Sequence, residues 1–115
     1  MQSLALTPAD SVRGDLSVPG DKSISHRYVL LSSLAPGRSV IEHLSSGADV
    51  AATIACVRAL GADVTVISPG VVAVTGRDWT RPLAALNAEN SGTTIRLMAG
   101  LLAACPFEST LTGDA

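Results

Sequence analysis

The sequence predicts an α/β protein built from a repeated strand–helix unit, and three observations lead to that prediction. Apolar residues make up 47% of the 115-residue chain and the formal net charge is −2, as expected of a folded globular protein. Three runs place apolar residues at helical spacing, and runs rich in β-branched residues lie between them. Two of the predicted helices also begin alike, which indicates an internal repeat.

The first copy of the unit opens with a predicted strand and helix. Loose alternation of apolar and polar residues over Val12–Val18 predicts a strand, which Pro19-Gly20 ends as a turn. An apolar helix begins at Ser23 or Ser25 and continues to Leu34. Pro36 and Gly37 follow at once and stop it.

A second strand and helix follow in the same order. Ser39–Leu44 predicts the strand, and Ser45–Gly47 forms a loop. Asp49 is expected to cap the next helix, which carries its apolar residues on one side. Gly61 stands in the terminating position of that helix.

A hairpin then completes the unit. Val64–Ile67 and Val71–Thr75 are rich in β-branched residues and are joined through Ser68-Pro69-Gly70. A polar loop through Trp79 and Pro82 follows the hairpin.

The second copy begins near Leu86. Its helix starts within Asn90–Thr93, continues to Leu102 and ends before Pro106, and Ser109–Thr112 is predicted to be a strand. We expect Ala115 to cut this second copy short, because Thr112 to Ala115 have the character of a loop within a repeat.

Composition argues against several classes of function. Tyr28, Trp79 and Phe107 are the only aromatic residues, so stacking platforms for nucleic acid are missing, and the negative charge disfavours such a partner. No apolar stretch is long enough for a membrane span, and we expect a cytoplasmic location. Cys56 and Cys105 lie far apart without metal-ligand spacing and are expected to be buried free thiols. Neither a metal nor a cofactor is expected.

The most informative motif is a group of hydrogen-bond donors at the start of the first helix. Lys22, Ser23 and Arg27 can converge on one phosphate or carboxylate, because a helix start offers free N–H groups and partial positive charge. Gly20 would let a ligand approach the backbone, whereas the carboxylate of Asp21 is unfavourable unless it turns away. The alternative is a solvated helix start that Ser23 caps.

A second helix start repeats this chemistry. Asn90-Ser91-Gly92-Thr93-Thr94 is followed by Arg96, just as the first start is followed by Arg27. Read alone, the segment favours an Asn or Ser cap with a flexible glycine, but two such starts suggest two anion sites or a doubly anionic ligand. Arg96 can either reach an anion or pair with a carboxylate in the interface between helices, and we expect the second, structural role. The two histidines, His26 and His43, are expected on the surface, since neither belongs to a triad pattern.

These two helix starts resemble the two N-terminal signatures of the 5-enolpyruvylshikimate-3-phosphate (EPSP) synthase family. The resemblance rests on Pro19–Arg27 and Asn90–Leu97, and extends to Ser46–Val50, Leu60–Ala62 and Thr112–Asp114, so it spans nearly the whole chain. It implies the enolpyruvyl transferase fold, in which two domains of repeated βαβαββ units bind substrates between them. This chain would hold the first unit and the start of the second.

The resemblance also implies substrates and a reaction. Lys22, Ser23 and Arg27 would bind shikimate-3-phosphate, while Lys22, Asn90 and Gly92 would bind phosphoenolpyruvate. In the reaction that the resemblance implies, the 5-hydroxyl of shikimate-3-phosphate would attack the protonated enolpyruvyl carbon, and the tetrahedral adduct would expel phosphate. No catalytic residue is assigned within this chain, because the family's acid–base carboxylates would lie beyond Ala115.

The family pattern makes further expectations about the whole protein. Residues 1–19 would be a strand segment that pairs with the C-terminal domain, and residues 20–115 would be part of the N-terminal domain. We expect the chain alone to be inactive, to expose apolar surface and to be unstable or to associate, and the full-length form to be a monomer. Glu89 departs from the family pattern, which more often has glycine there, and its carboxylate could weaken phosphoenolpyruvate binding.

Two other functions stay open at this point. UDP-N-acetylglucosamine enolpyruvyl transferase shares the fold and the phosphoenolpyruvate chemistry, but its first signature resembles a Lys-Asn-Ala run instead of the Lys22-Ser23 start. A non-catalytic module that binds phosphate is the other alternative.

Overall fold

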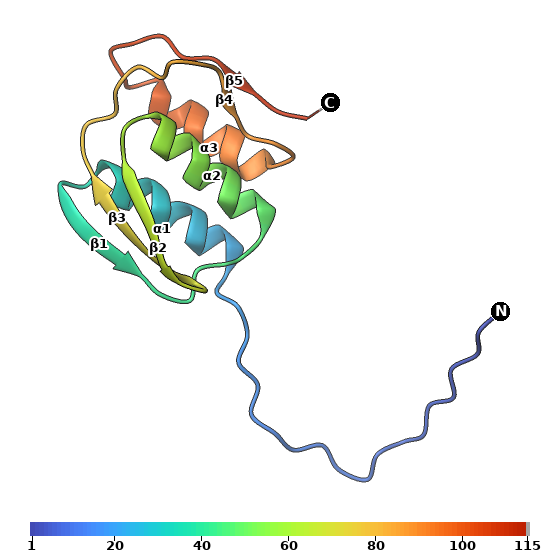
Figure 1. The fold of residues 1–115 in the computed structure, drawn as a ribbon. Helices are drawn as coiled ribbons and strands as arrows, with labels where there is room; N and C mark the ends of the chain where they lie inside the picture. Colours follow the sequence, from blue (N-terminus) through green and yellow to red (C-terminus); the bar gives the residue numbers. More distant parts are fainter. Residues whose placement is uncertain (115) are drawn as a thin grey trace.

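Three helices and a three-stranded antiparallel sheet form the body of the computed structural model, which describes residues 1–114 (Figure 1). α1 and α2 pack on the sheet, and α3 packs on these two helices on the far side. The elements are α1 (Lys22–Leu34), β1 (Gly37–Ile41), α2 (Ala48–Ala59), β2 (Asp63–Ser68), β3 (Val71–Gly76), β4 (Leu86–Asn87), α3 (Gly92–Leu102) and β5 (Leu111–Thr112). The predicted α/β class and the strand–helix alternation are therefore confirmed from residue 22 onward.

The sheet has the order β1-β3-β2, with β3 in the middle. Val74 of β3 lies opposite Ser39 of β1 and Val64 of β2, which fixes the register of all three strands. Val72 and Val74 are almost wholly buried, because the helices cover the sheet face that these two side chains share. The predicted hairpin of β2 and β3 is confirmed.

A close approach between α1 and β3 brings the sheet and the first helix together. A Cβ atom on Gly76 would collide with the carbonyl oxygens of Ser32 and Ala35, so only glycine fits there. Trp79, predicted in a polar loop, is 6% exposed, and its Nε1–H donates to Ser33 Oγ at 3.1 Å. The loop that contains Trp79 is therefore anchored on the last turns of α1.

The helix caps differ from those that the sequence suggested. The Asp21 carboxylate, and not the Ser23 hydroxyl, caps α1 by accepting from the Ile24 N–H at 2.8 Å. Gly47 occupies the cap position of α2, and Asp49 lies inside the first turn. The expected cap role of Asp49 is wrong because the helix begins at Ala48, two residues earlier than a cap at Asp49 requires. Gly61 follows α2 with φ 108, as predicted for a terminating glycine.

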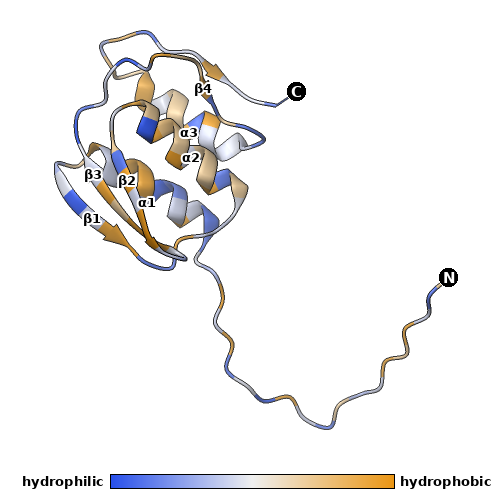
Figure 2. Ribbon diagram, in the orientation of Figure 1, coloured by the Kyte–Doolittle hydropathy of each residue, from blue (hydrophilic) through white to orange (hydrophobic). Residues whose placement is uncertain are grey.

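Residues 1–19 carry no strand. The prediction for Val12–Val18 is wrong for this chain, because a strand needs a neighbour for its backbone hydrogen bonds and the segment has none among residues 1–114. The segment leaves the body as an extended tail (Figure 1), and its scattered apolar residues meet no core (Figure 2). Val12, Leu16 and Val18 are each at least 65% exposed. The domain boundary after residue 19 stays a prediction.

Two other predicted strands are shorter than expected. β1 ends at Ile41 instead of Leu44, and β5 spans only Leu111–Thr112 of the predicted Ser109–Thr112. β5 pairs in parallel with β4, which begins at Leu86 where the second copy of the unit was predicted to begin. The two cysteines are free, and only Cys56 is buried as predicted, since Cys105 is half-buried.

Candidate functional site

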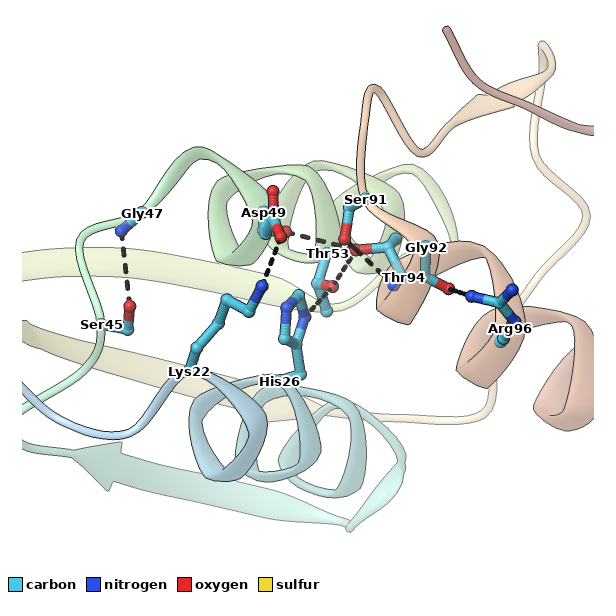
Figure 3. Close-up of polar contacts among 10 residues, drawn as sticks. All are labelled: Lys22, His26, Ser45, Gly47, Asp49, Thr53, Ser91, Gly92, Thr94 and Arg96. Carbon is cyan, nitrogen blue, oxygen red and sulfur yellow. Dashed lines mark hydrogen bonds and ion pairs between the residues drawn. The ribbon is translucent and has the colours of Figure 1, made fainter.

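The first turns of all three helices meet at one end of the body (Figure 3). Lys22 is the first residue of α1, and its Nζ lies 2.9 Å from Oδ2 of Asp49, the second residue of α2. Thr94, in the first turn of α3, donates its hydroxyl to the Asp49 carbonyl at 3.2 Å. Asp49 therefore contacts both helix starts that the sequence singled out.

Lys22 is held by Asp49 but remains accessible. The side chains of Lys22 and Asp49 are 53% and 31% exposed, so the ion pair lies at the surface. The hydrogen bond from Lys22 holds the pKa of the Asp49 carboxyl below its ordinary value. An ammonium has three donors, and Asp49 uses one, so the others can face an anion.

Ser23 and Arg27 lie on the exposed side of the same helix start. The Arg27 guanidinium folds back along α1 and donates to the Ser23 carbonyl at 2.9 Å. Its positive charge is therefore held next to the first turn, where Lys22 and Ser23 also lie. These three predicted residues are together on one helix end.

Arg96 repeats this arrangement on α3. Its Nη1 lies 3.5 Å from the Gly92 carbonyl, four residues earlier, as Arg27 lies against the carbonyl of Ser23. The expected pairing of Arg96 with a carboxylate is wrong, since the side chain is exposed and makes this backbone contact instead. Arg27 and Arg96 both line an apolar groove between α1 and α3. The internal repeat thus extends to the two arginines.

The second predicted segment is exposed at two of its five residues. Asn90 and Gly92 are exposed, and a Cβ on Gly92 would meet only the end of the Arg96 side chain. Ser91 caps α3 by accepting from the Thr94 N–H at 3.1 Å. The Arg96 guanidinium therefore lies directly beside Gly92 at the exposed start of α3.

Glu89 is turned toward β4. Its backbone has φ 49, in the left-handed region that favours glycine, and its carboxylate accepts from Asn87 Nδ2 at 3.1 Å. Glu89 nevertheless lines, with Asp49, Asn90 and Asp114, a groove of about 620 Å³ beside α2. Asn90 therefore adjoins carboxylates as well as the α3 start.

A buried chain of polar side chains lies directly beneath this surface (Figure 3). His26 Nδ1 lies 2.7 Å from Thr53 Oγ1, and Thr53 Oγ1 lies 2.8 Å from Thr94 Oγ1. Thr94 Oγ1 in turn lies 2.7 Å from Ser91 Oγ. The chain links α1, α2 and the cap of α3.

His26 is fully buried, so its predicted surface position is wrong, whereas His43 is exposed as expected. Burial lowers the pKa of His26, with Asp49 opposing and Lys22 and Arg27 adding to the shift. The spacing of His26 to the buried Val29 and Leu30 is the signal that could have placed it on the inner face of α1.

The structure explains the glycine at position 20 by the packing of the backbone, and not by the expected approach of a ligand. A Cβ at this position would collide with the His43 carbonyl, so the glycine lets two backbone segments approach each other.

The arrangement is suited to holding anions. Three helix starts, two guanidinium groups and one ammonium share this end of the body, and each helix start adds partial positive charge. Within residues 1–114, no three His, Cys, Asp or Glu side chains are grouped to hold a metal ion. None of the helices described in this range is long and apolar enough to cross a membrane.

Comparison with known proteins identifies the family. The family described as EPSP synthase (3-phosphoshikimate 1-carboxyvinyltransferase) matches residues 6–115. Over 117 residues the chain is 45% identical to the 3-phosphoshikimate 1-carboxyvinyltransferase of Koribacter versatilis, and over 120 residues it is 50% identical to that of Chloroflexus aurantiacus. Each alignment covers 100% of this chain and 27% of the relative.

A solved structure agrees with these relatives. The fold matches EPSP synthase from Acinetobacter baumannii with a TM-score of 0.84 and 37% identity, over 89% of this chain and 24% of that protein. The chain thus spans about a quarter of the length of the proteins it matches. The sequence match, the structural match and the repeated helix starts agree, and the chain belongs to the EPSP synthase family.

Proposed function

We propose that this chain contributes the N-terminal part of a 3-phosphoshikimate 1-carboxyvinyltransferase. The complete enzyme would transfer the enolpyruvyl group of phosphoenolpyruvate to the 5-hydroxyl of shikimate-3-phosphate and release phosphate. The observation that carries the proposal is the meeting of the α1 and α3 starts at one end of the body, through the contacts of Asp49 with Lys22 and Thr94.

Lys22, Ser23 and Arg27 are proposed to bind shikimate-3-phosphate. The Arg27 guanidinium lies against the Ser23 carbonyl, and the Lys22 ammonium projects from the same turn. A phosphate beside them would receive charge-assisted hydrogen bonds and the partial positive charge of the helix start. The ion pair with Asp49 restricts the conformations of the exposed Lys22 side chain, which lowers the entropy lost when the ligand binds.

Lys22, Asn90 and Gly92 are proposed to bind phosphoenolpyruvate. Gly92 and Asn90 are both exposed at the α3 start, and Asn90 offers a side-chain amide that can donate to a carboxylate or phosphate. The hydrogen bond of Glu89 to Asn87 keeps one oxygen of its carboxylate engaged away from that start, which moderates the repulsion expected from this residue. Lys22 would then neutralise charge shared by two anionic substrates.

Charge neutralisation and positioning are the contributions we assign to these residues. The two substrates repel each other, and cations between them lower the barrier to the attack of the hydroxyl on the enolpyruvyl carbon. Proton transfer to the enolpyruvyl methylene carbon and from the hydroxyl is assigned to groups outside this chain.

The test is phosphate release from shikimate-3-phosphate and phosphoenolpyruvate, measured with the chain alone and with the chain mixed with the separately produced remainder of a relative. We expect release only in the mixture, and Lys22→Ala should lower it by about 10²-fold or more, as loss of a charge-stabilising group does. Arg38→Ala, which removes an exposed cation from β1, is the matched control and should leave the rate unchanged.

Each other outcome has a definite meaning. Release by the chain alone would overturn the assignment of proton transfer to groups outside it. Release with UDP-N-acetylglucosamine in place of shikimate-3-phosphate would favour the other enolpyruvyl transferase. A mixture that binds phosphate but never turns over would favour the non-catalytic alternative.

A further inference from the structure

The buried polar side chains beneath the candidate site can be assigned a direction of hydrogen-bond donation. The Asp49 carbonyl can only accept, so its contact with Thr94 uses the Thr94 hydroxyl proton, and the Ser91 hydroxyl supplies the proton for the contact between Ser91 and Thr94. The contact between Thr94 and Thr53 then needs the proton of Thr53. Because that proton is used, His26 Nδ1 must carry the hydrogen of its own contact with Thr53.

This direction of donation leaves one ring nitrogen of His26 without a hydrogen atom. His26 Nε2 is buried and has no hydrogen-bond partner among residues 1–114. In the tautomer with hydrogen on Nδ1, Nε2 is an unprotonated acceptor, whereas the other tautomer would bury an unpaired N–H donor and reverse the hydroxyls. Reversal would also take the Thr94 proton away from the Asp49 carbonyl.

These buried side chains join the two helix starts that are proposed to bind substrates, and the central residue, Thr53, belongs to neither. Thr53 lies on α2, is fully buried and has contacts to both α1 and α3. The α1 side leads from His26 to Lys22 one turn earlier, and the α3 side leads through Ser91 to the exposed Gly92. A shift of α1 relative to α3 would therefore break short hydrogen bonds in the interior.

We propose that His26 is a positioning residue, which as the neutral Nδ1–H tautomer heads a buried chain through Thr53 and Thr94 that holds the starts of α1 and α3 in one arrangement. The use of this arrangement for ligand binding rests on the proposed function. The test below uses no substrate and no turnover, so either proposal can fail without the other.

The first measurement is the tautomer of His26 in the unaltered chain. Long-range ¹H–¹⁵N correlation spectra at about pH 7.5, where a histidine is largely neutral, should show hydrogen on Nδ1. His43→Asn removes the other histidine and assigns the signals. Hydrogen on Nε2 would overturn the proposal, and this result does not depend on the folding of a variant in the core.

The second measurement removes the middle of the hydroxyl chain. Thr53→Val keeps the shape of the side chain and should speed amide hydrogen exchange at the first turns of both α1 and α3, read at Ser25, Thr94 and Ile95. An increase on the order of fivefold to tenfold is expected for one lost buried hydrogen bond. Thr53→Ser keeps the hydroxyl and should restore protection.

Two comparisons show whether Thr53→Val affects the positions of the helix starts or the stability of the whole fold. Thr65→Val removes an exposed hydroxyl from β2 and should leave the helix starts unchanged. A uniform increase in exchange that includes the amides of β3, or no increase at α3, would overturn the proposal. Should Thr53→Val unfold the chain, His26→Leu and His26→Asn make the same comparison from α1, because the Asn amide can donate where Nδ1 does.

Discussion

His26 should make the stability of the fold depend on pH. Its pKa is lowered in the folded chain, so the unfolded chain binds more protons between that lowered pKa and the ordinary value of about 6.5. The free energy of unfolding should therefore fall as the pH drops below this value, by at most about 1.4 kcal/mol per pH unit. The charged groups that act on the ring are Asp49 from α2 and Lys22 and Arg27 from α1, while α3 offers hydroxyls.

In the unaltered chain, the midpoint of chemical denaturation should decrease when the pH is lowered from about 7.5 to about 5.5. His26→Asn keeps a donor at the Nδ1 position but cannot take up a proton, so the same decrease should be smaller in this variant. His43→Asn, which changes the exposed histidine, should behave like the unaltered chain. Equal pH dependence in all three proteins would contradict the assignment to His26.

Gly20 offers a second prediction at this scale. A Cβ there would collide with the His43 carbonyl, and a backbone atom cannot move aside as a side chain can. Gly20→Ala should therefore lower the free energy of unfolding by about 1–3 kcal/mol, the usual cost of overpacking. Gly14→Ala is the matched control, since nothing lies within 4 Å of its added methyl group, and it should be neutral in chemical denaturation.

Helix bodies were predictable because they depend on local patterning. Apolar spacing together with Pro36, Gly61 and Pro106 located α1, α2 and α3 to within a few residues. The caps were less predictable, because Asp21, Ser23 and Asp49 all have side chains that can cap. The choice among them depends on the backbone angles at the start of each helix, which neighbouring segments determine.

Gly100 in α3 gives a prediction at the scale of one element. No atom lies within 4 Å of a Cβ added there, so alanine costs no packing and gains the higher helix propensity. Gly100→Ala should raise the free energy of unfolding by about 0.5–1 kcal/mol. A lower denaturation midpoint would mean that a segment packs closely against this face of α3.

The exposed tail should govern the association of the whole molecule. Residues 1–18 are exposed and include apolar side chains, while the core lies entirely in the body that follows. Removing residues 1–18 should leave the midpoint of thermal unfolding unchanged and should reduce concentration-dependent association. Light scattering after size-exclusion chromatography, with circular dichroism for the midpoint, measures both.

Two results would contradict this picture of the molecule. A sharp cooperative transition from a monomeric full chain would refute the expectation that the chain is unstable or associates. A large drop in the midpoint after removal of the tail would mean that the tail packs on the body.

The candidate site was predictable in part. Lys22, Ser23, Arg27, Asn90 and Gly92 could be selected because donors and glycine at a helix start are a local signal. Asp49 and Thr53 could not, because an aspartate and a threonine on an apolar helix are ordinary residues until α2 is placed between α1 and α3. Their contacts join residues far apart in the chain.

The amino-acid sequence by itself determined the α/β class, the helices, the hairpin, the repeat and the family, since these follow from local spacing and from motifs that are contiguous in the chain. Only the tertiary structure decided that His26 is buried, that Asp49 holds Lys22 and that Val12–Val18 forms no strand. Burial and strand pairing depend on which distant segments become neighbours, and no local pattern contains that information.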